Sequence, residues 1–309
     1  MGTMYLEHFG LKEAPFSLTP NTEYFLNVQG YQEALNTLLV GLENCDAFIK
    51  VTGEVGTGKT LLCRKLYNSL GEQYHVIYLR MPCTTEMDLF FAVAKALRVK
   101  EYSRLTKPEL LNAIEGKLAT LHRLGKRTVL LVDEAQTLSP RALEALRLLT
   151  NQETETDKLL QIVMFGQSEL DERLKNPRLR QLRQRIVFSY SLKPMDRHAL
   201  GLYIHHRLFV AGYEGDVLFT PKALDMLYKA SNGIPRVVNI LSHKALLVGF
   251  GQGMHRVTDQ HVSRAVNDSG SSTGAVKAPN LSLRPELQLG IAVLIVCGVG
   301  LFLFEHLGV

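Results

Sequence analysis

Cysteine is scarce in this chain, and its few copies lie far apart. The 309 residues include four cysteines, Cys45, Cys63, Cys83 and Cys297, and no two of them form a Cys-x-x-Cys pair. A structural zinc site requires closely spaced ligands, and a disulfide framework is typical of short secreted chains that are rich in cysteine. The pattern therefore indicates neither kind of site and favours a protein of the reducing cytosol.

Targeting signals, repeats and a dominant charge are also missing. The opening MGTMYLEHFG has neither the basic n-region nor the apolar h-region of a secretory signal peptide. No internal repeat is present, and no long apolar run occurs before Arg284. The net charge of +5, with 46% hydrophobic and 21% charged residues, is typical of a globular chain. This mildly basic balance permits an anionic partner but does not require one.

Five short and nearly continuous apolar runs punctuate the first part of the chain. They cover residues 47–51, 75–79, 128–133, 159–165 and 186–192. Such runs are typical of strands buried on both faces of a parallel sheet. Because stretches with helical spacing separate them, we expect βαβ units and a three-layer α/β fold with a parallel sheet.

The strand signal stops at Lys193. Successive stretches with helical spacing, each ending at a glycine, continue to residue 268 and predict a small all-helical domain over 193–268. Residues 269–285 begin with a Gly/Ser-rich stretch that offers little to bury, so we expect a flexible linker there.

The octapeptide GEVGTGKT, residues 53–60, fits the G-x-x-x-x-G-K-[ST] pattern between a predicted strand and a predicted helix. Glycines free the backbone to turn its N–H groups toward phosphate oxygens, and the following helix adds the positive end of its dipole. Lys59 would reach the β and γ phosphates, and the Thr60 hydroxyl would ligate Mg²⁺. A chance glycine-rich turn is the alternative, which the strand–loop–helix context disfavours. The expected nucleotide contacts are Gly53, Glu54, Val55, Gly56, Thr57, Gly58, Lys59, Thr60 and Leu61.

A second half of this site is expected where the run TVLLVDEAQ ends a buried strand in two acids. Asp133 would hold Mg²⁺ through its water shell. Glu134 would orient and deprotonate the attacking water. A strand that ends in solvated acids is the alternative, but the phosphate loop upstream favours a hydrolase with a glutamate base.

These features together resemble the AAA+ ATPases, which also have a further strand with a polar tip and a helical lid. The resemblance implies ATP as the nucleotide, a nucleotide-binding domain over 1–192 and a lid over 193–268. It implies γ-phosphate sensors at Gln167, in IVMFGQSEL, and at Arg236, in GIPRVVN. It also places the N-terminal segment near the adenine, with Tyr31 as the candidate contact. The alternatives are that Gln167 is an ordinary turn amide, that Arg236 is a solvated side chain, and that the aromatic residues of the N-terminal segment belong to the core.

A strongly basic stretch follows at residues 173–188. Its cations are Arg173, Lys175, Arg178, Arg180, Arg183 and Arg185. A solvated helix face and a nucleic-acid patch are two interpretations. The third follows from the AAA+ resemblance, because that family places a finger for the neighbouring subunit's site just before its last core strand. Arg185 is then the first candidate and Arg183 the second, and a finger supplied in trans implies a homo-oligomeric ring or dimer.

The resemblance extends from residue 4 to residue 268 for a narrower group, the secretion-pathway ATPases of the ExeA/general secretion protein A type. It rests on HFGLKEAPFSLTPNTEYFL, VLLVDEAQTLS, LRQRI and the motifs above. Within that group the chain is most similar to the MshM-type ATPases of MSHA (mannose-sensitive haemagglutinin) type IV pilus biogenesis. ExeA-type proteins continue beyond a membrane span into a periplasmic peptidoglycan-binding region, and this sequence stops before one.

An apolar tail ends the sequence. Residues 287–304 carry no charge and would span about 27 Å as a helix, close to the hydrocarbon thickness of a bilayer. We expect a transmembrane helix over 286–304 and a short tail over 305–309. Lys277 and Arg284 precede this segment, so the positive-inside rule keeps the ATPase domain in the cytoplasm, at a bacterial inner membrane. A buried core helix is the alternative.

Three hypotheses remain in competition. The leading one is a membrane-anchored, Mg²⁺-dependent ATPase that drives assembly or remodelling of a pilus or secretion complex with inner-membrane partners. The second is a DNA-acting ATPase of the transposition-helper kind, which the basic stretch favours and the apolar tail disfavours. The third is a nucleotide-gated scaffold with little turnover.

Overall fold

The computed structural model describes residues 4–27, 29–44, 48–79, 83–150 and 158–272. The chain divides into a compact unit over residues 1–266 and a second unit over 267–309. The fold described below is that of the first unit.

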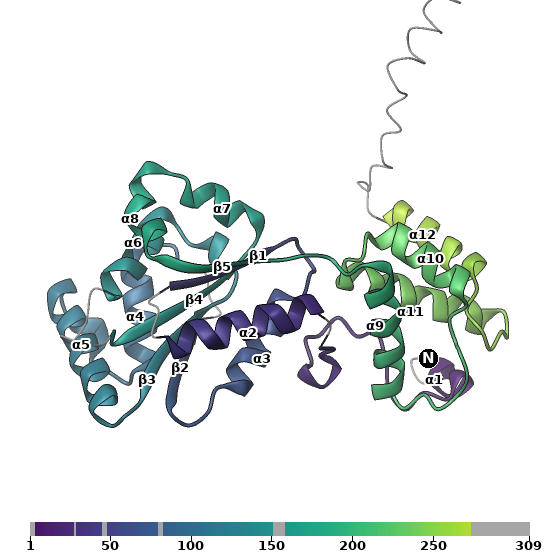
Figure 1. Ribbon diagram of the computed structural model, residues 1–309, viewed down its shortest axis with the longest axis horizontal. Coiled ribbons are helices and arrows are strands. Elements are labelled where there is room, and N and C mark those ends of the chain that lie inside the picture. The colour runs from purple at the N-terminus through teal and green to yellow at the C-terminus, as the bar shows by residue number, and fades with distance from the viewer. Residues whose placement is uncertain (1–3, 28, 45–47, 80–82, 151–157, 273–309) are drawn as a thin grey trace, which may run out of the picture. The chain divides into compact units, whose positions relative to one another are not determined.

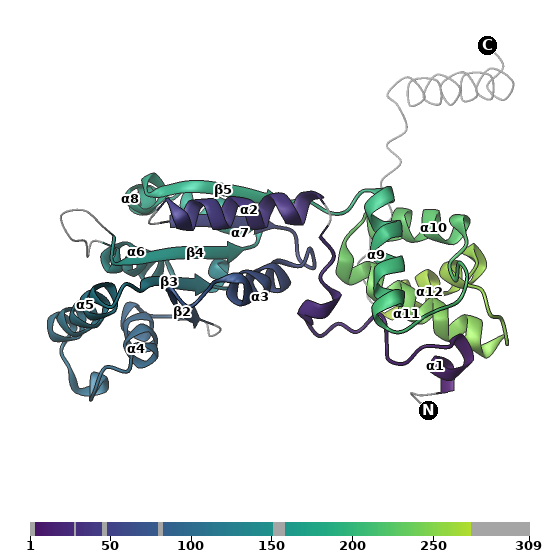
Figure 2. The same cartoon turned by 60° about the horizontal axis from the view of Figure 1, so that its bottom comes forward.

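A five-stranded parallel sheet forms the centre of the α/β region (Figure 1). Its strands are β1 (Phe48–Gly53), β2 (Tyr74–Leu79), β3 (Arg127–Val132), β4 (Leu160–Gly166) and β5 (Ile186–Leu192). Their order is β2-β3-β4-β1-β5, and every neighbouring pair is parallel. Figure 2 shows the progression from β5 to β2 across the sheet. The predicted parallel sheet is therefore confirmed, with strand ends displaced by a residue or two.

Helices cover both faces of this sheet. On one face lie α2 (Gln29–Glu43) and α3 (Lys59–Ser69), and on the other lie α4 (Glu86–Ala96), α5 (Lys107–Arg123) and α6 (Pro140–Leu149). The pleat divides β3 between them, because Val129 and Leu131 are buried with α2 and α3 whereas Leu130 and Val132 are buried with α4 to α6. Strands buried on both sides explain the continuous apolar runs in the sequence.

Short helices connect these layers. They are η1 (Thr22–Tyr24), η2 (Tyr102–Arg104), η3 (Ala135–Thr137), α7 (Ser168–Leu174), η4 (Pro177–Leu179) and α8 (Arg180–Gln184). Several helices begin at a side chain that accepts a backbone N–H, such as Ser139 before α6, whose hydroxyl accepts from Ala142 at 3.1 Å. The caps fix where each helix leaves the sheet and so position the loops that follow the strands.

A second hydrophobic core is built mainly from helices. Its helices are α9 (Arg197–Val210), α10 (Pro221–Ser231), α11 (Pro235–Gly251) and α12 (Asp259–Ser272), and α1 (Met4–Phe9) packs among them. Tyr5, Phe9, Leu11 and Phe16 are buried in this cluster. Residues 4–16 were expected to belong to the nucleotide-binding domain over 1–192, but their apolar side chains are buried in the helical core.

The expected membrane helix over 286–304, the tail over 305–309 and most of the expected linker over 269–285 lie outside the described residues. The helix α12 continues to Ser272, which is four residues into the expected linker. In the part of the chain that the structure describes, no helix is long and apolar enough to cross a membrane.

Candidate nucleotide site

The loop between β1 and α3 has the conformation of a phosphate cradle. Gly56 and Gly58 have φ angles of 85° and 90°, in the left-handed region that favours glycine. A Cβ at Gly58 would lie 3.0 Å from the Tyr31 hydroxyl oxygen, and one at Gly56 would lie 2.8 Å from the Cβ of Arg236. The loop is thus enclosed on two sides by side chains, and both glycines are required for its shape.

Lys59 is a buried cation at the start of α3. Only 6% of the residue is exposed, and its Nζ donates to the carbonyl oxygens of Gly53 at 2.8 Å and Glu54 at 2.7 Å. Burial lowers the pKa of Lys59, while the nearby charges of Glu134 and Asp133 act in the opposite direction. Among the described residues no carboxylate lies within 4.0 Å of this ammonium group. A buried cation held only by carbonyl oxygens is suited to an anionic ligand.

Two carboxylates follow β3 at the same edge of the sheet. Asp133 accepts from the Glu134 N–H at 3.0 Å and from the Tyr78 hydroxyl at 3.1 Å. Burial, together with the Asp133 charge, raises the pKa of Tyr78, so its hydroxyl keeps its proton and remains a donor. Glu134 has φ 53°, a left-handed conformation that is costly for a residue with a Cβ.

Amide side chains hold the Glu134 carboxylate. Its Oε2 accepts from Gln136 Nε2 at 2.5 Å and from Gln167 Nε2 at 3.3 Å. Gln167 stands at the end of β4, the neighbour of β3 in the sheet, which explains how a residue 33 positions away reaches Glu134. The predicted sensor position and the predicted base are therefore in contact.

Arg236 reaches the phosphate loop from the start of α11. Its backbone N–H donates to the Gly56 carbonyl at 3.2 Å, and its side chain is exposed toward the cavity. The turn before it depends on Gly233, which has φ 72°. A Cβ at Gly233 would lie 1.9 Å from the Met195 carbonyl oxygen, so no larger residue fits. The Gly-Ile-Pro-Arg motif thus brings an arginine to the loop through a turn that only glycine can make.

A cavity of about 370 Å³ joins these elements, a volume in the range of small-molecule sites. Of the predicted residues, its lining includes Val55, Gly56, Gly58, Lys59, Thr60, Leu61, Glu134, Gln167 and Arg236. A larger cavity of about 460 Å³ in the helical region is mostly apolar and contains no lysine or arginine. The cavity beside the phosphate loop has Lys59 and Arg236 in its lining, two cations that can bind phosphate.

The remaining predicted residues support the loop from outside this lining. The Thr57 hydroxyl donates to the Glu54 carbonyl at 2.8 Å, and Gly53 and Glu54 accept from Lys59. Tyr31, the candidate adenine contact, is buried against Gly58 and donates its hydroxyl to the Thr57 carbonyl. It does not line the cavity, because its ring packs behind the loop.

Residues outside the predicted set of nucleotide contacts also line the cavity. They are Ser17, Leu18, Thr19, Pro20, Asn21, Tyr203, Arg207, Pro235 and Asn239. Arg207 is only 5% exposed and donates to the carbonyls of Pro15 and, at 3.3 Å, Ser17, and to the Tyr203 hydroxyl at 2.9 Å. Tyr203 donates in turn to Asn239 Oδ1 at 2.9 Å. No motif marks Tyr203 or Arg207, since a single arginine in a helix is usually solvated. Ser17 to Asn21 lie in HFGLKEAPFSLTPNTEYFL, and Pro235 and Asn239 lie in GIPRVVN, but neither motif indicates that they line the cavity.

The chemistry of the loop and the acids fits Mg²⁺ bound together with a nucleotide. A threonine hydroxyl at Thr60 and a carboxylate at Asp133 are hard oxygen ligands of the kind that Mg²⁺ takes. No group of three His, Cys, Asp or Glu side chains that could hold a metal occurs within the described ranges. The phosphates and water would therefore have to complete the coordination shell.

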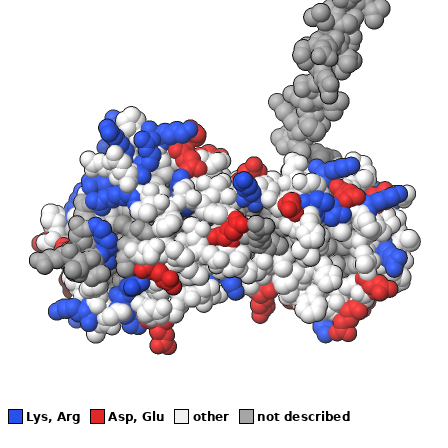
Figure 3. Space-filling model, in the orientation of Figure 1, with Lys and Arg blue, Asp and Glu red and all other residues white. Residues whose placement is uncertain are grey.

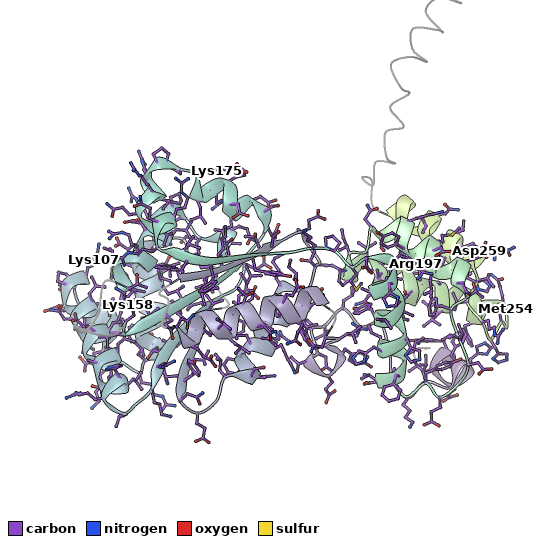
Figure 4. The ribbon with its side chains drawn as sticks, in the orientation of Figure 1. Lys107, Lys158, Lys175, Arg197, Met254 and Asp259 are labelled. Atoms are coloured by element: carbon purple, nitrogen blue, oxygen red, sulfur yellow. The ribbon has the colours of Figure 1, made fainter. Side chains whose placement is uncertain are left out.

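The two finger candidates lie far from this cavity in their own subunit. Arg185 precedes β5 and donates to the Thr150 hydroxyl at 2.9 Å, while Arg183 is exposed in α8. The strand β5 has seven residues and pairs in parallel with β1, so its start is about 20 Å from the edge that carries the phosphate loop. Figure 3 shows basic side chains gathered over α7 and α8, where Figure 4 labels Lys175.

Comparison with known proteins agrees with this geometry. Residues 44–174 match the AAA domain family. The chain is also 42% identical over 262 residues to general secretion pathway protein A of Aeromonas hydrophila, covering 85% of this chain and 48% of that protein. It thus spans about half the length of this relative.

Solved structures resemble the fold at low identity. An Aeropyrum pernix ORC2 protein has a TM-score of 0.63 at 14% identity, over 85% of this chain and 72% of that one. Cdc6p of Pyrobaculum aerophilum has a TM-score of 0.63 at 18% identity, over 82% of this chain and 70% of that one. A Walker-type ATPase of Pyrococcus abyssi has a TM-score of 0.57 at 18% identity, over 84% of this chain and 77% of that one. Together the matches show an AAA-type α/β fold and sequence similarity to general secretion pathway protein A.

Proposed function

We propose that this protein binds Mg·ATP beside the phosphate loop and hydrolyses it. The observation that carries the proposal is the buried Lys59 ammonium, which has carbonyl partners only and faces Asp133 and Glu134. An anionic ligand would complete the electrostatics of this site, and a nucleotide triphosphate fits both the cavity and the loop.

Each side chain then has a defined task. Lys59 holds the β and γ phosphates, and the loop N–H groups hold the phosphate oxygens. Thr60 and Asp133 hold Mg²⁺, which neutralises charge on the phosphates. Glu134 orients the attacking water and takes its proton, and Gln167 and Arg236 contact the γ-phosphate. The helical region 193–268 acts as a lid, because Arg236 belongs to it.

We further propose that copies of this chain assemble in a ring or dimer, with Arg185 or Arg183 as the finger for the neighbour's site. The distance of about 20 Å between the start of β5 and the phosphate edge supports this, since neither arginine can reach its own site across that span. Arg183 is the better placed of the two, because it is exposed whereas Arg185 is hydrogen-bonded to Thr150.

The biological role that we propose is ATP-driven assembly or remodelling of a pilus or secretion complex at the bacterial inner membrane. The 42% identity to general secretion pathway protein A supports a secretion role. The sequence resemblance to the MshM-type ATPases favours an MSHA-type pilus, and the apolar segment over 286–304 supports a single span with the ATPase domain in the cytoplasm. Partners would then be inner-membrane assembly proteins.

Purified full-length protein in detergent tests the enzymatic proposal. Wild type, Lys59→Met and Glu134→Gln are compared for binding of a fluorescent ATP analogue and for phosphate release, with and without Mg²⁺. We expect Lys59→Met to lose binding, and Glu134→Gln to bind normally while turnover falls at least about 100-fold. Equal, slow turnover in wild type and Glu134→Gln would support a scaffold instead. Turnover stimulated by DNA, with binding that weakens steeply in salt, would support the DNA-acting alternative.

A further inference from the structure

Gln136 connects the predicted base to the predicted sensor position. It lies in η3, two residues after Glu134, and only 9% of it is exposed. Its Nε2 donates to Glu134 Oε2 at 2.5 Å, and its Oε1 accepts the backbone N–H of Gln167 at 3.0 Å. One buried amide therefore bridges the tips of β3 and β4.

The orientation of this amide is determined by its two partners. A carboxylate accepts only, so the group that faces Glu134 must be the NH₂. A backbone N–H donates only, so the group that faces Gln167 must be the carbonyl oxygen. Rotating the amide by half a turn would place two acceptors together at Glu134 and two donors together at Gln167, at a cost at both ends.

Glu134 depends on such a contact for its position. Its backbone is in the left-handed region, and its second donor, Gln167 Nε2, lies at the longer distance of 3.3 Å. A Gln167 side chain that turns toward a γ-phosphate gives up its bond to Glu134. The Gln136 bond is then the one that keeps Oε2 fixed and leaves the other oxygen of Glu134 for water.

We propose that Gln136 is a positioning residue for hydrolysis, which orients the Glu134 carboxylate and couples it to Gln167. This inference rests on the proposed function and adds to it a residue that acts on the base without contacting nucleotide; Gln136 does not line the cavity. Through Gln136, the orientation of the Glu134 carboxylate depends on the position of the Gln167 backbone at the end of β4.

Two substitutions separate the two ends of the bridge. Gln136→Glu keeps an oxygen for the Gln167 N–H but replaces the donor to Glu134 with a second carboxylate. Gln136→Met has a similar length and loses both bonds. Gln260→Glu, an exposed residue of α12, is the control for the added negative charge.

The test measures kcat, KM, the Kd of a fluorescent ATP analogue and the Tm of full-length protein for each variant. We expect Gln136→Glu and Gln136→Met to lower kcat by about 10- to 100-fold with Kd changed less than about 3-fold. In a Glu134→Gln background, where the base is already absent, Gln136→Glu should change turnover less than about 2-fold. A purely structural role would instead lower Tm and kcat together and would add to Glu134→Gln.

Three outcomes overturn the proposal. They are an unchanged kcat in both variants, a matching loss of analogue binding, or an additive loss in the Glu134→Gln background. If Gln136→Glu is unfolded at the assay temperature, Gln136→Met decides the question. Absence of turnover in wild type would overturn the proposed function as well, whereas normal wild-type turnover with an unaffected Gln136→Glu overturns this inference alone.

Discussion

Arg207 provides the sharpest test of how the cavity wall is held together. Its guanidinium donates to the carbonyls of Pro15 and Ser17 and lies 4.5 Å from the centre of the Tyr24 ring. These contacts attach the segment that precedes the sheet to α9 of the helical core. Replacing the arginine with methionine keeps much of its apolar stem and removes every one of the polar contacts.

The expected loss can be worked out from those contacts. The buried Pro15 carbonyl left without a donor costs about 1–3 kcal/mol, and the Ser17 carbonyl costs less because Ser17 is exposed and water can replace the donor. The ring contact of a desolvated guanidinium contributes about 1–2 kcal/mol. Partial repacking and water entry recover some of this, so we expect Arg207→Met to lower the free energy of unfolding by about 3 kcal/mol. For a domain of this size that corresponds to a fall in Tm of about 6–12 °C.

Thermal unfolding of the full chain, followed by circular dichroism, measures this change. Arg178→Met is the matched control, because Arg178 is exposed. The Tm of this variant should differ from that of the wild type by no more than about 2 °C. Arg207→Lys keeps the charge but has fewer donors, so its Tm should fall between those of the wild type and Arg207→Met. If Arg207→Met melts within 1–2 °C of Arg178→Met, the guanidinium does not hold the segment and the reasoning is refuted.

Three further predictions concern the phosphate loop and its neighbours. Gly233→Ala should lower Tm by about 5 °C or more, because its Cβ would lie 1.9 Å from the Met195 carbonyl oxygen. Tyr78→Phe should raise the Mg²⁺ concentration needed for half-maximal turnover by about 10-fold, because Asp133 loses its 3.1 Å donor. Arg183→Ala should leave Tm and analogue binding unchanged because the residue is exposed. It should lower turnover at least about 100-fold if Arg183 is the finger proposed for a neighbour's site.

Each of these predictions has a contrary outcome. An unchanged Tm for Gly233→Ala would show that the turn before Arg236 is not fixed by the Met195 carbonyl. A normal Mg²⁺ requirement for Tyr78→Phe would show that the Tyr78 hydroxyl does not contribute to Mg²⁺ binding through Asp133. Wild-type turnover for Arg183→Ala would direct attention to Arg185, whose replacement should also cost stability through the lost Thr150 contact.

The sheet could be predicted from sequence because its signal is local. Three of the strands, β1, β3 and β4, are mostly or wholly apolar and are buried from both sides, so continuous runs mark them. The edge strand β2 is mostly partly exposed. The edge strand β5 alternates between partly exposed and exposed residues, yet the run of large side chains from Ile186 still identifies it. The phosphate loop could also be predicted from sequence, since its glycines and lysine stand at fixed spacing.

The wall of the cavity and its supporting bonds could not be predicted. Arg207 and its acceptors Pro15 and Ser17 are about 190 positions apart in the chain, and no periodic pattern connects them. Gln136 has the composition of an ordinary turn residue, and only the folded register of β3 beside β4 brings its amide to Gln167. Local patterns predict elements, whereas these contacts depend on how distant elements meet.

The burial of α1 within the helical core has a consequence for synthesis on the ribosome. His8 Nε2 donates to the Met254 carbonyl, 246 positions later, at 3.0 Å; Met254 is labelled in Figure 4. At about 5–20 residues per second, the first turns of the chain wait roughly 12–50 s for their packing partners to be translated. During that interval the sheet can form first. The aromatic side chains of α1 stay exposed until their packing partners are made, and ribosome-associated chaperones can bind them. Nascent-chain truncations of increasing length should therefore protect the strands from protease well before they protect Tyr5 and Phe9.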